Sequence, residues 1–211
     1  MKLHFFLVED QIILRQLLKA HLQEQFPGCR ISEAGSLAEA RSMAKDLGQT
    51  DLAIIDLELP DGNSLDWVES WVKNPGQPRV ILLSAISEEY VLFRALQSNL
   101  PGFVHKTDNT EMLHLAIKTV LAGGVFYSPT VQRMRSQMQV DPDFFEKVLT
   151  EREQNILGYL GQGLSNEEVA QIIGLKETSV ADHRKNIMGK LNVHNQAELI
   201  RYALKKGFSR I

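Results

Sequence analysis

The chain contains a single cysteine and no run of apolar residues long enough to cross a bilayer. Because Cys29 has no second cysteine to pair with, an intrachain disulfide and a metal cage built from cysteines are both excluded. A membrane-spanning helix needs roughly 18 successive apolar residues, so we expect no membrane partner. The segment Met1–Val8 runs directly into Glu9 and Asp10 without a small-residue cleavage site, unlike a signal peptide. We therefore expect a soluble, cytoplasmic protein.

Excess charge is also scarce, since the net charge of the whole chain is −3. Its distribution is more informative, because residues 1–126 carry −5 and residues 149–211 carry +2. So small a positive charge argues against strong, nonspecific attraction to nucleic acid. Any affinity of the rear part for DNA must therefore come from where its charges sit.

Short, continuously apolar segments recur through residues 1–122. Runs of this kind are typical of strands that are buried on both faces of a parallel sheet. Helical spacing lies between them, with one apolar stripe from Leu14 to Leu22 and another from Leu113 to Leu121. The alternation predicts a doubly wound, five-stranded parallel sheet of the flavodoxin-like type. The five predicted strands are Leu3–Val8, a weaker one near Cys29–Ile31, Leu52–Ile55, Val80–Leu83 and Phe103–Val104.

Three shorter helical segments of this region each follow a residue whose side-chain oxygen suits a helix N-cap. These residues are Ser36, Asn63 and Ser87. The strand–helix alternation ends near residue 122. Residues 123–147 contain Pro129 and Pro142 with mixed charges, and we interpret them as a linker that carries some helix around Val131–Met138.

Residues 148–211 show only helical spacing and form a second predicted domain. Capping-box patterns start at Thr150 and at Ser165, and Gly174-Leu175 makes a tight turn between the second and third helices. Two short helices joined by a glycine turn suggest a helix-turn-helix, which gives a small all-α domain of four helices. The predicted helices are about Glu151–Gly161, Asn166–Ile173, Glu177–Lys190 and Gln196–Lys206.

Charged and polar side chains follow four of the predicted strands at their carboxyl ends. In an open α/β sheet these ends share one edge, where ligands bind. Glu9 and Asp10 follow the first strand, Asp56 ends the third, Ser84 ends the fourth, and Lys106 follows the fifth. Any one of these acids would be more simply a solvated loop residue, but that explanation is poor for four strand ends together. Crowded carboxylates favour a divalent cation, and Mg²⁺ shares oxygen ligands with phosphate groups.

The segments around these residues resemble the receiver domain of two-component response regulators over roughly residues 1–122. They are Leu7-Val8-Glu9-Asp10, Ile55-Asp56-Leu57-Glu58-Leu59-Pro60-Asp61-Gly62, Leu83-Ser84-Ala85 and Gly102-Phe103-Val104-His105-Lys106. The resemblance implies that Asp56 is the phosphoacceptor and that Mg²⁺ is held by Glu9, Asp10, Asp56 and the backbone carbonyl of Glu58. It further implies that Ser84 and Lys106 bind the phosphoryl group, and that Phe103 is an aromatic that changes rotamer on activation.

This chain departs mildly from the receiver pattern, since Glu9 stands where Asp is more usual and Phe103 where Tyr also occurs. The longer side chain of Glu9 leaves open a contact with the metal through water. A position in the hydrophobic core is the simpler alternative for Phe103. Its place three residues before Lys106 favours the switch role.

The third helix of the rear domain is the expected DNA-reading helix. Spacing alone is equally compatible with a helical bundle whose charged face is merely solvated. The segments Leu149–Glu153, Gly163–Ala170 and Thr178–Leu191 resemble the LuxR-type domain of the NarL/FixJ family over about residues 147–207. The resemblance implies base contacts from Ala181, Asp182 and Lys185, and phosphate contacts from Arg184 and Lys190.

Several positions depart from the LuxR-type pattern. Ala181 often corresponds to Lys, and Lys176 stands where a Ser or Thr cap is usual, so that helix start is less well capped. Asp182 carries a negative charge toward the groove, although a carboxylate accepts a hydrogen bond from cytosine N4. We therefore expect an unusual site preference. His105 and His183 have no partner at ligand spacing, and we assign them no metal.

Together the two resemblances imply a response regulator that takes its phosphoryl group from a histidine kinase and then binds double-stranded promoter DNA as a homodimer. RNA polymerase is a further expected partner. The receiver would phosphorylate and dephosphorylate only itself, so the chain is not expected to be an enzyme with a separate substrate. Two alternatives remain: DNA binding independent of phosphorylation, and a rear domain that docks a protein instead of DNA.

Overall fold

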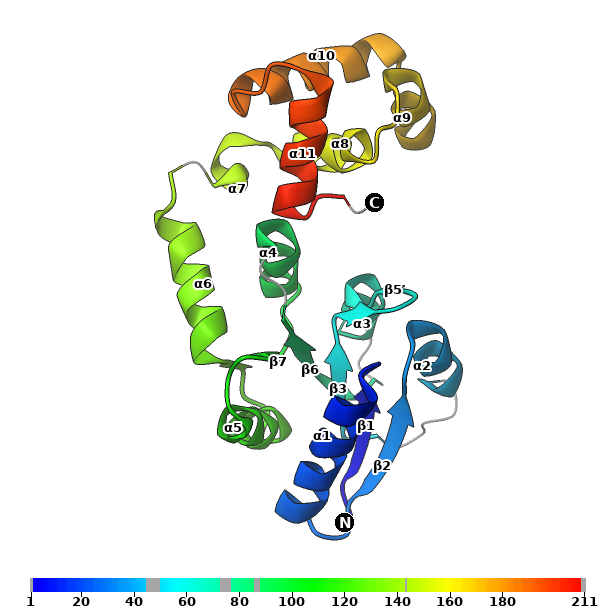
Figure 1. The fold of residues 1–211 in the computed structure, drawn as a ribbon, viewed down its shortest axis with the longest axis vertical. Coiled ribbons are helices and arrows are strands. Elements are labelled where there is room, and N and C mark those ends of the chain that lie inside the picture. Colours follow the sequence, from blue (N-terminus) through cyan, green and yellow to red (C-terminus); the bar gives the residue numbers. More distant parts are fainter. Residues whose placement is uncertain (1, 45–49, 73–76, 86–87, 143, 210–211) are drawn as a thin grey trace. The chain divides into compact units, whose positions relative to one another are not determined.

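The computed structural model describes residues 2–44, 50–72, 77–85, 88–142 and 144–209. Its contacts divide the chain into two compact units. The first unit consists of Met1–Ile86 and Arg94–Met134, and the second of Ser87–Phe93 and Arg135–Ile211. Each unit is built around its own elements (Figure 1). Among the described residues, no helix is both long and apolar enough to span a membrane.

A parallel sheet forms the centre of the first unit, and in the described part of the chain it has six strands in the order β2-β1-β3-β6-β7-β8. Every neighbouring pair is parallel, as the predicted alternation of strands and helices requires. The central strands are apolar along most of their length because both of their faces are covered. The six strands are β1 (His4–Val8), β2 (Arg30–Ala34), β3 (Leu52–Asp56), β6 (Arg79–Ser84), β7 (Gly102–His105) and β8 (Phe126–Tyr127).

Helices α1 (Ile12–Gln25) and α5 (Thr110–Leu121) cover one face of this sheet (Figure 1). Their inward stripes meet alternate strand residues in a fully buried core, as the period of two along each strand demands. Asn109 caps α5 by accepting a hydrogen bond from the backbone N–H of Met112. The core on this face includes Leu18, Leu22, Leu113 and Ile117 from the helices, with Phe5, Leu7, Ile54, Ile81 and Val104 from the strands.

Helices α2 (Leu37–Ala44) and α3 (Leu65–Val72) pack on the opposite face of the sheet, and α4 (Glu89–Gln97) follows β6. The predicted caps at Ser36 and Asn63 are confirmed, since their side-chain oxygens accept hydrogen bonds from the N–H groups of Glu39 and Leu65. The predicted cap at Ser87 lies outside the described residues. A small antiparallel pair, β4 (Glu58–Leu59) with β5 (Gly62–Asn63), follows β3.

The prediction of five strands was one short, because β8 lies inside the predicted linker. Its two residues pair with Gly102 and Phe103 of β7. A strand of two residues leaves almost no hydrophobic pattern in the sequence, and its partner lies far away along the chain. The helix expected near Val131–Met138 is present as α6 (Pro129–Val140).

Helices alone make up the rest of the second unit, and four of them match the ranges expected from the sequence. Thr150 with Glu153 and Ser165 with Glu168 both form complete capping boxes. Gly174 ends α9 in the left-handed conformation, with φ 68°, which a residue with a side chain rarely adopts. The helices are α7 (Phe145–Val148), α8 (Glu151–Gly161), α9 (Asn166–Ile173), α10 (Glu177–Lys190) and α11 (Gln196–Lys206).

An aromatic cluster lies within the second unit, where the first half of α4 contributes two of its rings. The rings of Tyr90 and Phe208 stack at 4.1 Å between centroids, and Phe145 contacts both edge-on. Phe93 and Phe144 complete the cluster. Edge-on and offset contacts of this kind stabilise a core beyond the area they bury.

Candidate functional site

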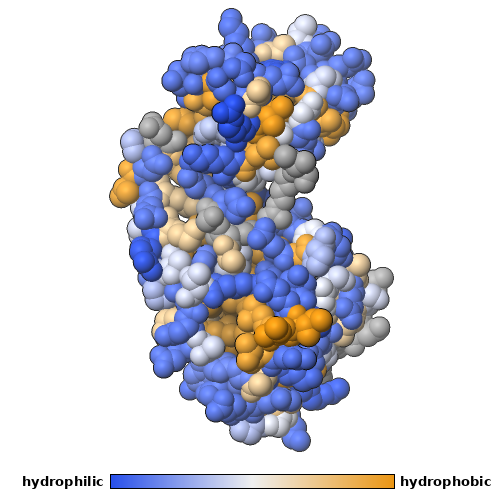
Figure 2. Space-filling view, viewed as in Figure 1, coloured by the Kyte–Doolittle hydropathy of each residue, from blue (hydrophilic) through white to orange (hydrophobic). Residues whose placement is uncertain are grey.

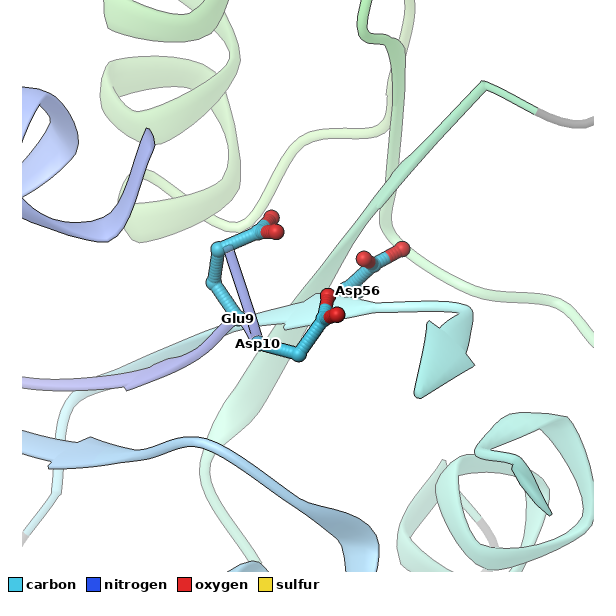
Figure 3. A group of neighbouring side chains, drawn as sticks. All are labelled: Glu9, Asp10 and Asp56. Atoms are coloured by element: carbon cyan, nitrogen blue, oxygen red, sulfur yellow. The ribbon is translucent and has the colours of Figure 1, made fainter. Parts of the chain in front are cut away.

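Three acidic side chains converge at the carboxyl edge of the sheet (Figure 3). Glu9 and Asp10 follow β1, while Asp56 is the last residue of the adjacent strand β3. One carboxylate oxygen from each lies within 4.8 Å of those of the other two. Glu9 and Asp56 are buried, and Asp10 is partly exposed. The sequence-based expectation that these strand ends share one site is met by this geometry.

The ammonium group of Lys106, which follows β7, lies between the two buried acids. Its Nζ donates a hydrogen bond to Asp56 Oδ2 over 2.7 Å and lies 2.8 Å from Glu9 Oε2. That Glu9 oxygen is buried and has no aligned hydrogen-bond donor. The other, Oε1, accepts from the backbone N–H of Gln11. The four side chains bring three potential negative charges against one positive charge.

Burial dominates the electrostatics of this cluster. Burial raises the pKa of Glu9 and of Asp56 above their usual values, while the ammonium of Lys106 beside both carboxylates opposes the rise. Burial would lower the pKa of Lys106, but the adjacent carboxylates of Asp56 and Glu9 outweigh that effect and raise it. Among the described residues, the ion pairs of this partly dehydrated cluster set one cation, Lys106, against three acidic side chains.

Ser84 is buried at the end of β6, the strand next to that of Asp56, and Phe103 is buried within β7, on the far side of β6. Ser84 is linked to Lys106 through the backbone, because the Lys106 N–H donates to the Ser84 carbonyl over 2.8 Å. Glu58 contributes its backbone N–H, which donates to Asp56 Oδ1 over 3.1 Å. The ligand role of the Glu58 carbonyl and the rotamer change of Phe103 stay predictions.

Two serines that were not predicted from the sequence form hydrogen bonds to the backbone at this edge of the sheet. The buried hydroxyl of Ser64 donates to the Asp56 carbonyl over 2.8 Å, which fixes the end of β3. The buried Ser128, between β8 and α6, accepts a hydrogen bond from the His105 N–H, one residue before Lys106. Neither could be identified from the sequence, because each bond joins segments that are separated along the chain.

The donor set fits a hard divalent cation. Mg²⁺ prefers oxygen ligands and uses one or two carboxylates with water and phosphate oxygens. Glu9, Asp10 and Asp56 supply carboxylate oxygens at one point, and the buried Glu9 Oε2 still lacks an aligned donor. His105 has its Nδ1 paired with the Thr107 hydroxyl at 2.7 Å.

Helix α10 presents the side chains that the sequence assigns to DNA reading. Asp182 and Lys185 are exposed, while Ala181 is partly buried. Lys176 precedes the helix as its N-cap and makes no side-chain capping bond, as the sequence predicts. Val180 and Ile187 on the inward face are fully buried. The helix therefore has a buried apolar face and an exposed polar face, as groove entry requires.

The two residues predicted to contact phosphate, Arg184 and Lys190, also contact side chains of their own unit. Arg184 donates to Asn166 Oδ1 at the start of α9 over 3.2 Å. Lys190 pairs with the buried carboxylate of Glu153 over 2.7 Å. Burial raises the pKa of Glu153, but the bonds from Lys190 and Thr150 outweigh it and lower the pKa. These links hold α10 against α8 and α9.

Comparison with known families agrees with both halves of this description. The model of the response regulator receiver domain matches residues 5–118, and that of bacterial regulatory proteins of the luxR family matches residues 147–203. The Fimbriae Z protein of Escherichia coli (strain K12) is 34% identical over 72% of this chain and 73% of its own length. The transcriptional regulatory protein MctR of Rhizobium johnstonii is 29% identical over 98% and 95%, respectively.

Solved structures share the fold over nearly the whole chain. RcsB from Salmonella enterica serovar Typhimurium, bound to promoter rprA in the presence of the phosphomimetic BeF3-, aligns with a TM-score of 0.65 at 19% identity. The alignment covers 96% of this chain and 98% of RcsB. The response regulator ChrA aligns with a TM-score of 0.54 at 24% identity and covers 98% of both chains. The receiver match alone spans more than half of the chain. The chain thus belongs to the two-component response regulators of the NarL/FixJ type, which join a receiver domain to a LuxR-type helix-turn-helix domain that binds DNA and regulates transcription.

Proposed function

We propose that a sensor histidine kinase transfers a phosphoryl group to Asp56, and that this transfer controls the binding of α10 to specific promoter sites. The observation that carries the proposal is the cluster at the sheet edge. Asp56 is buried, two further carboxylates lie within 4.8 Å, and Lys106 lies 2.7 Å from Asp56. A purely structural ion pair would need no such excess of acids, since unpaired buried charge destabilises a fold.

The chemical step is a nucleophilic attack by a carboxylate oxygen of Asp56 on phosphorus. The bond from phosphorus to the imidazole nitrogen of the donor histidine breaks, and that nitrogen keeps the electron pair. Lys106 then exchanges its contact with Asp56 for one with a phosphoryl oxygen, while the Ser84 hydroxyl donates to another. In this role the chain modifies only itself and turns over no separate substrate.

Glu9, Asp10 and Asp56 would hold the Mg²⁺ ion, with the Glu58 carbonyl as a further ligand. When bound, the ion neutralises negative charge on the carboxylates and on the incoming phosphoryl oxygens. Glu9 has the longest side chain of the three, and its Oε2 has no aligned hydrogen-bond donor. This oxygen would therefore suit a contact with the ion through a metal-bound water.

Phosphorylation adds roughly two negative charges beside Ser84 and Phe103. In this proposal both side chains respond, the chain forms homodimers, and two α10 helices enter half-sites about one DNA turn apart. Lys185 and Asp182 face the groove, and the carboxylate of Asp182 accepts from cytosine N4. The bound dimer would then act on RNA polymerase at those promoters. The protein would work in the cytoplasm, where the promoter DNA lies.

A direct test maps the phosphoryl group. The purified chain is incubated with acetyl phosphate and Mg²⁺, and the intact mass and its peptides are measured. We expect one phosphoryl group on the peptide of Asp56, none in Asp56→Asn, and none after removal of divalent ions with a chelator. Labelling of another residue, or equal labelling of Asp56→Asn, would refute Asp56 as the acceptor.

A further inference from the structure

Helix α6 follows β8 and has little apolar surface with which to hold itself in place. Of its residues only Val131 and Met138 are buried. Most of its exposed side chains are hydrophilic, as Figure 2 shows where α6 lies in Figure 1. A helix in a protein normally owes its stability to the packing of an apolar face. Polar contacts at the first turn therefore matter more in α6 than in a helix with a continuous apolar stripe.

The first turn of α6 uses a carboxylate from another segment, since it contains no acidic residue of its own. The Thr130 hydroxyl donates to Asp108 Oδ1 over 2.7 Å. Partial burial raises the pKa of Asp108, but the nearby hydroxyls of Ser128 and Thr130 and the Thr130 N–H outweigh this effect and lower the pKa. Negative charge is stabilising at a helix N-terminus, because the first N–H groups there have no partner within the helix. Asp108 thus acts as a cap for α6.

Asp108 lies two residues after Lys106, in a loop whose backbone is bonded on both sides of that lysine. The Lys106 N–H donates to the Ser84 carbonyl over 2.8 Å, and the Asp108 N–H donates to the His105 carbonyl over 2.9 Å. The His105 N–H donates to the hydroxyl of Ser128, which directly precedes α6, over 3.1 Å. The residues before and after the Lys106–Thr107 pair are therefore both bonded to the start of α6.

The ammonium group of Lys106 depends on this backbone because it contacts acids from two different strands. Its Nζ lies 2.7 Å from Asp56 Oδ2 and 2.8 Å from Glu9 Oε2. A misplacement of about 1 Å among reacting groups can cost about a hundredfold in rate. The bonds from the Lys106 loop to α6 all lie within the first unit.

We propose that Asp108 is a positioning residue for Lys106: by capping α6 it fixes the loop from which Lys106 reaches Asp56 and Glu9. It acts through the loop backbone and not on the reacting atoms. The inference rests on the proposed function for the role of Lys106 in phosphoryl transfer. Because coupling between two sites is reciprocal, a phosphoryl group that holds Lys106 also stabilises the first turn of α6.

Amide hydrogen exchange of the full chain tests the positioning without any phosphoryl donor. Thr130→Val replaces the hydroxyl by a methyl group of similar size, and Asp108→Ala removes the cap altogether. Each should speed exchange of the Lys106 N–H about fivefold. The double variant should exchange no faster than Asp108→Ala, since both changes remove the same interaction. Thr130→Ser keeps the hydroxyl and should exchange like wild type. Unchanged exchange at Lys106 in both single variants would overturn the proposal.

Asn109→Ala is the matched control. Asn109 is the next residue of the same loop, and it caps α5 by accepting from the Met112 N–H. Loss of this cap should weaken the start of α5 and leave the Lys106 N–H at its wild-type exchange rate. Equal acceleration in Asn109→Ala would assign the effect to the loop in general and contradict a specific link to α6.

The rate of labelling by acetyl phosphate and Mg²⁺ tests the consequence for Lys106. Asp108→Ala and Thr130→Val should each be labelled about tenfold more slowly than wild type, whereas Thr130→Ser and Asn109→Ala should keep the wild-type rate. Wild-type labelling in the first two variants, despite faster exchange at Lys106, would reduce the link to a structural role and overturn the proposal.

Beryllofluoride separates this inference from the proposed function. With Mg²⁺ it should slow amide exchange at residues 130–132 of wild type about fivefold, and should not do so in Thr130→Val. A response at Lys106 without one at the start of α6 would contradict the coupling. A wild type that is neither labelled nor affected by beryllofluoride would refute the proposed function, whereas the exchange rates of Lys106 in the variants would still decide whether Asp108 positions it.

Discussion

At the scale of single residues, the ionised form of Asp56 is stabilised by one positive charge and destabilised by burial and by nearby negative charges. Lys106 donates to it over 2.7 Å, whereas burial raises its pKa and Glu9 and Asp10 add negative charge nearby. Such a pocket gains stability from any cation that enters it, because the unfolded chain has no equivalent site. In the proposed function, this carboxylate is the nucleophile and Lys106 is the neighbouring group that stabilises charge.

Magnesium should therefore stabilise the fold in the absence of any phosphoryl donor. At ten times its dissociation constant the ion adds about 1.4 kcal/mol to the free energy of unfolding, measured as a higher urea midpoint of the first unit. Asp10→Asn should lose most of this increment. Asp61→Asn is the control, since Asp61 caps α2, is not one of the three clustered acids, and its variant should keep the increment. An unchanged increment in Asp10→Asn would mean that the ion binds elsewhere.

Lys190 and Lys185 lie on the same helix and should behave differently on truncation. Lys190→Ala leaves the buried carboxylate of Glu153 without its charged partner and should cost about 1–2 kcal/mol of unfolding free energy. Lys185→Ala should stay within about 0.5 kcal/mol of wild type, yet weaken DNA binding. Urea unfolding and fluorescence anisotropy with a promoter fragment measure the two effects. Equal stability losses would contradict the structural role of Lys190.

At the scale of elements, α1 and α5 meet through a histidine pair. Burial lowers the pKa of His114 below its usual 6.5, and the charges of Lys118 on α5 and His21 on α1 lower it further. His21 Nε2 and His114 Nδ1 are buried without a hydrogen-bond partner. The Phe26 ring, 5.6 Å from His114 between centroids, offers no charge to offset protonation.

Protonation of His114 should therefore lower the free energy of unfolding of the first unit as the pH falls. Because the folded pKa is lower than the unfolded one, the unfolded chain takes up more protons once the pH falls below about 6.5. The contribution of neutral His114 to the free energy of unfolding is present in full above that pH. It is lost as the pH falls through the folded pKa of His114. Urea midpoints at about pH 7.5 and 5.5 should differ less in His114→Phe than in wild type. An identical difference in both proteins would rule out His114 as the cause.

Ser128, between β8 and α6, accepts a hydrogen bond from the end of β7, one residue before Lys106. Ser128→Ala removes the acceptor of the buried His105 N–H and should cost about 1–3 kcal/mol. Amide hydrogen exchange should show faster exchange in β8 and at the start of α6, and no change in α8 or α9. Uniform protection throughout the chain would indicate that the bond contributes nothing locally.

The same elements explain what the sequence could and could not predict. Helices α8 to α11 matched because their signals are local: capping boxes at Thr150 and Ser165, and Gly174 at the turn. The acidic cluster was predictable because parallel strand ends must share an edge. The strand β8 and the Lys190–Glu153 pair were not, since each depends on partners far along the chain. A two-residue strand and a lone surface lysine leave no periodic pattern to detect.

At the scale of the whole molecule, the chain joins a receiver domain, which carries the acidic cluster, to a LuxR-type helix-turn-helix domain. A phosphoryl group at Asp56 changes the local charge by roughly two units. Such a change shifts an equilibrium between two states only as far as those states differ in their affinity for it. Control of DNA binding therefore requires that the state with higher DNA affinity also be the one that phosphorylation favours.

The most direct test of this control measures DNA affinity and mass in solution with and without beryllofluoride and Mg²⁺, in wild type and Asp56→Ala side by side. We predict that beryllofluoride raises the affinity of wild type for promoter DNA and its fraction of dimer, and that Asp56→Ala responds in neither. Wild type that binds DNA equally with and without beryllofluoride would contradict the switch and leave the receiver as a scaffold.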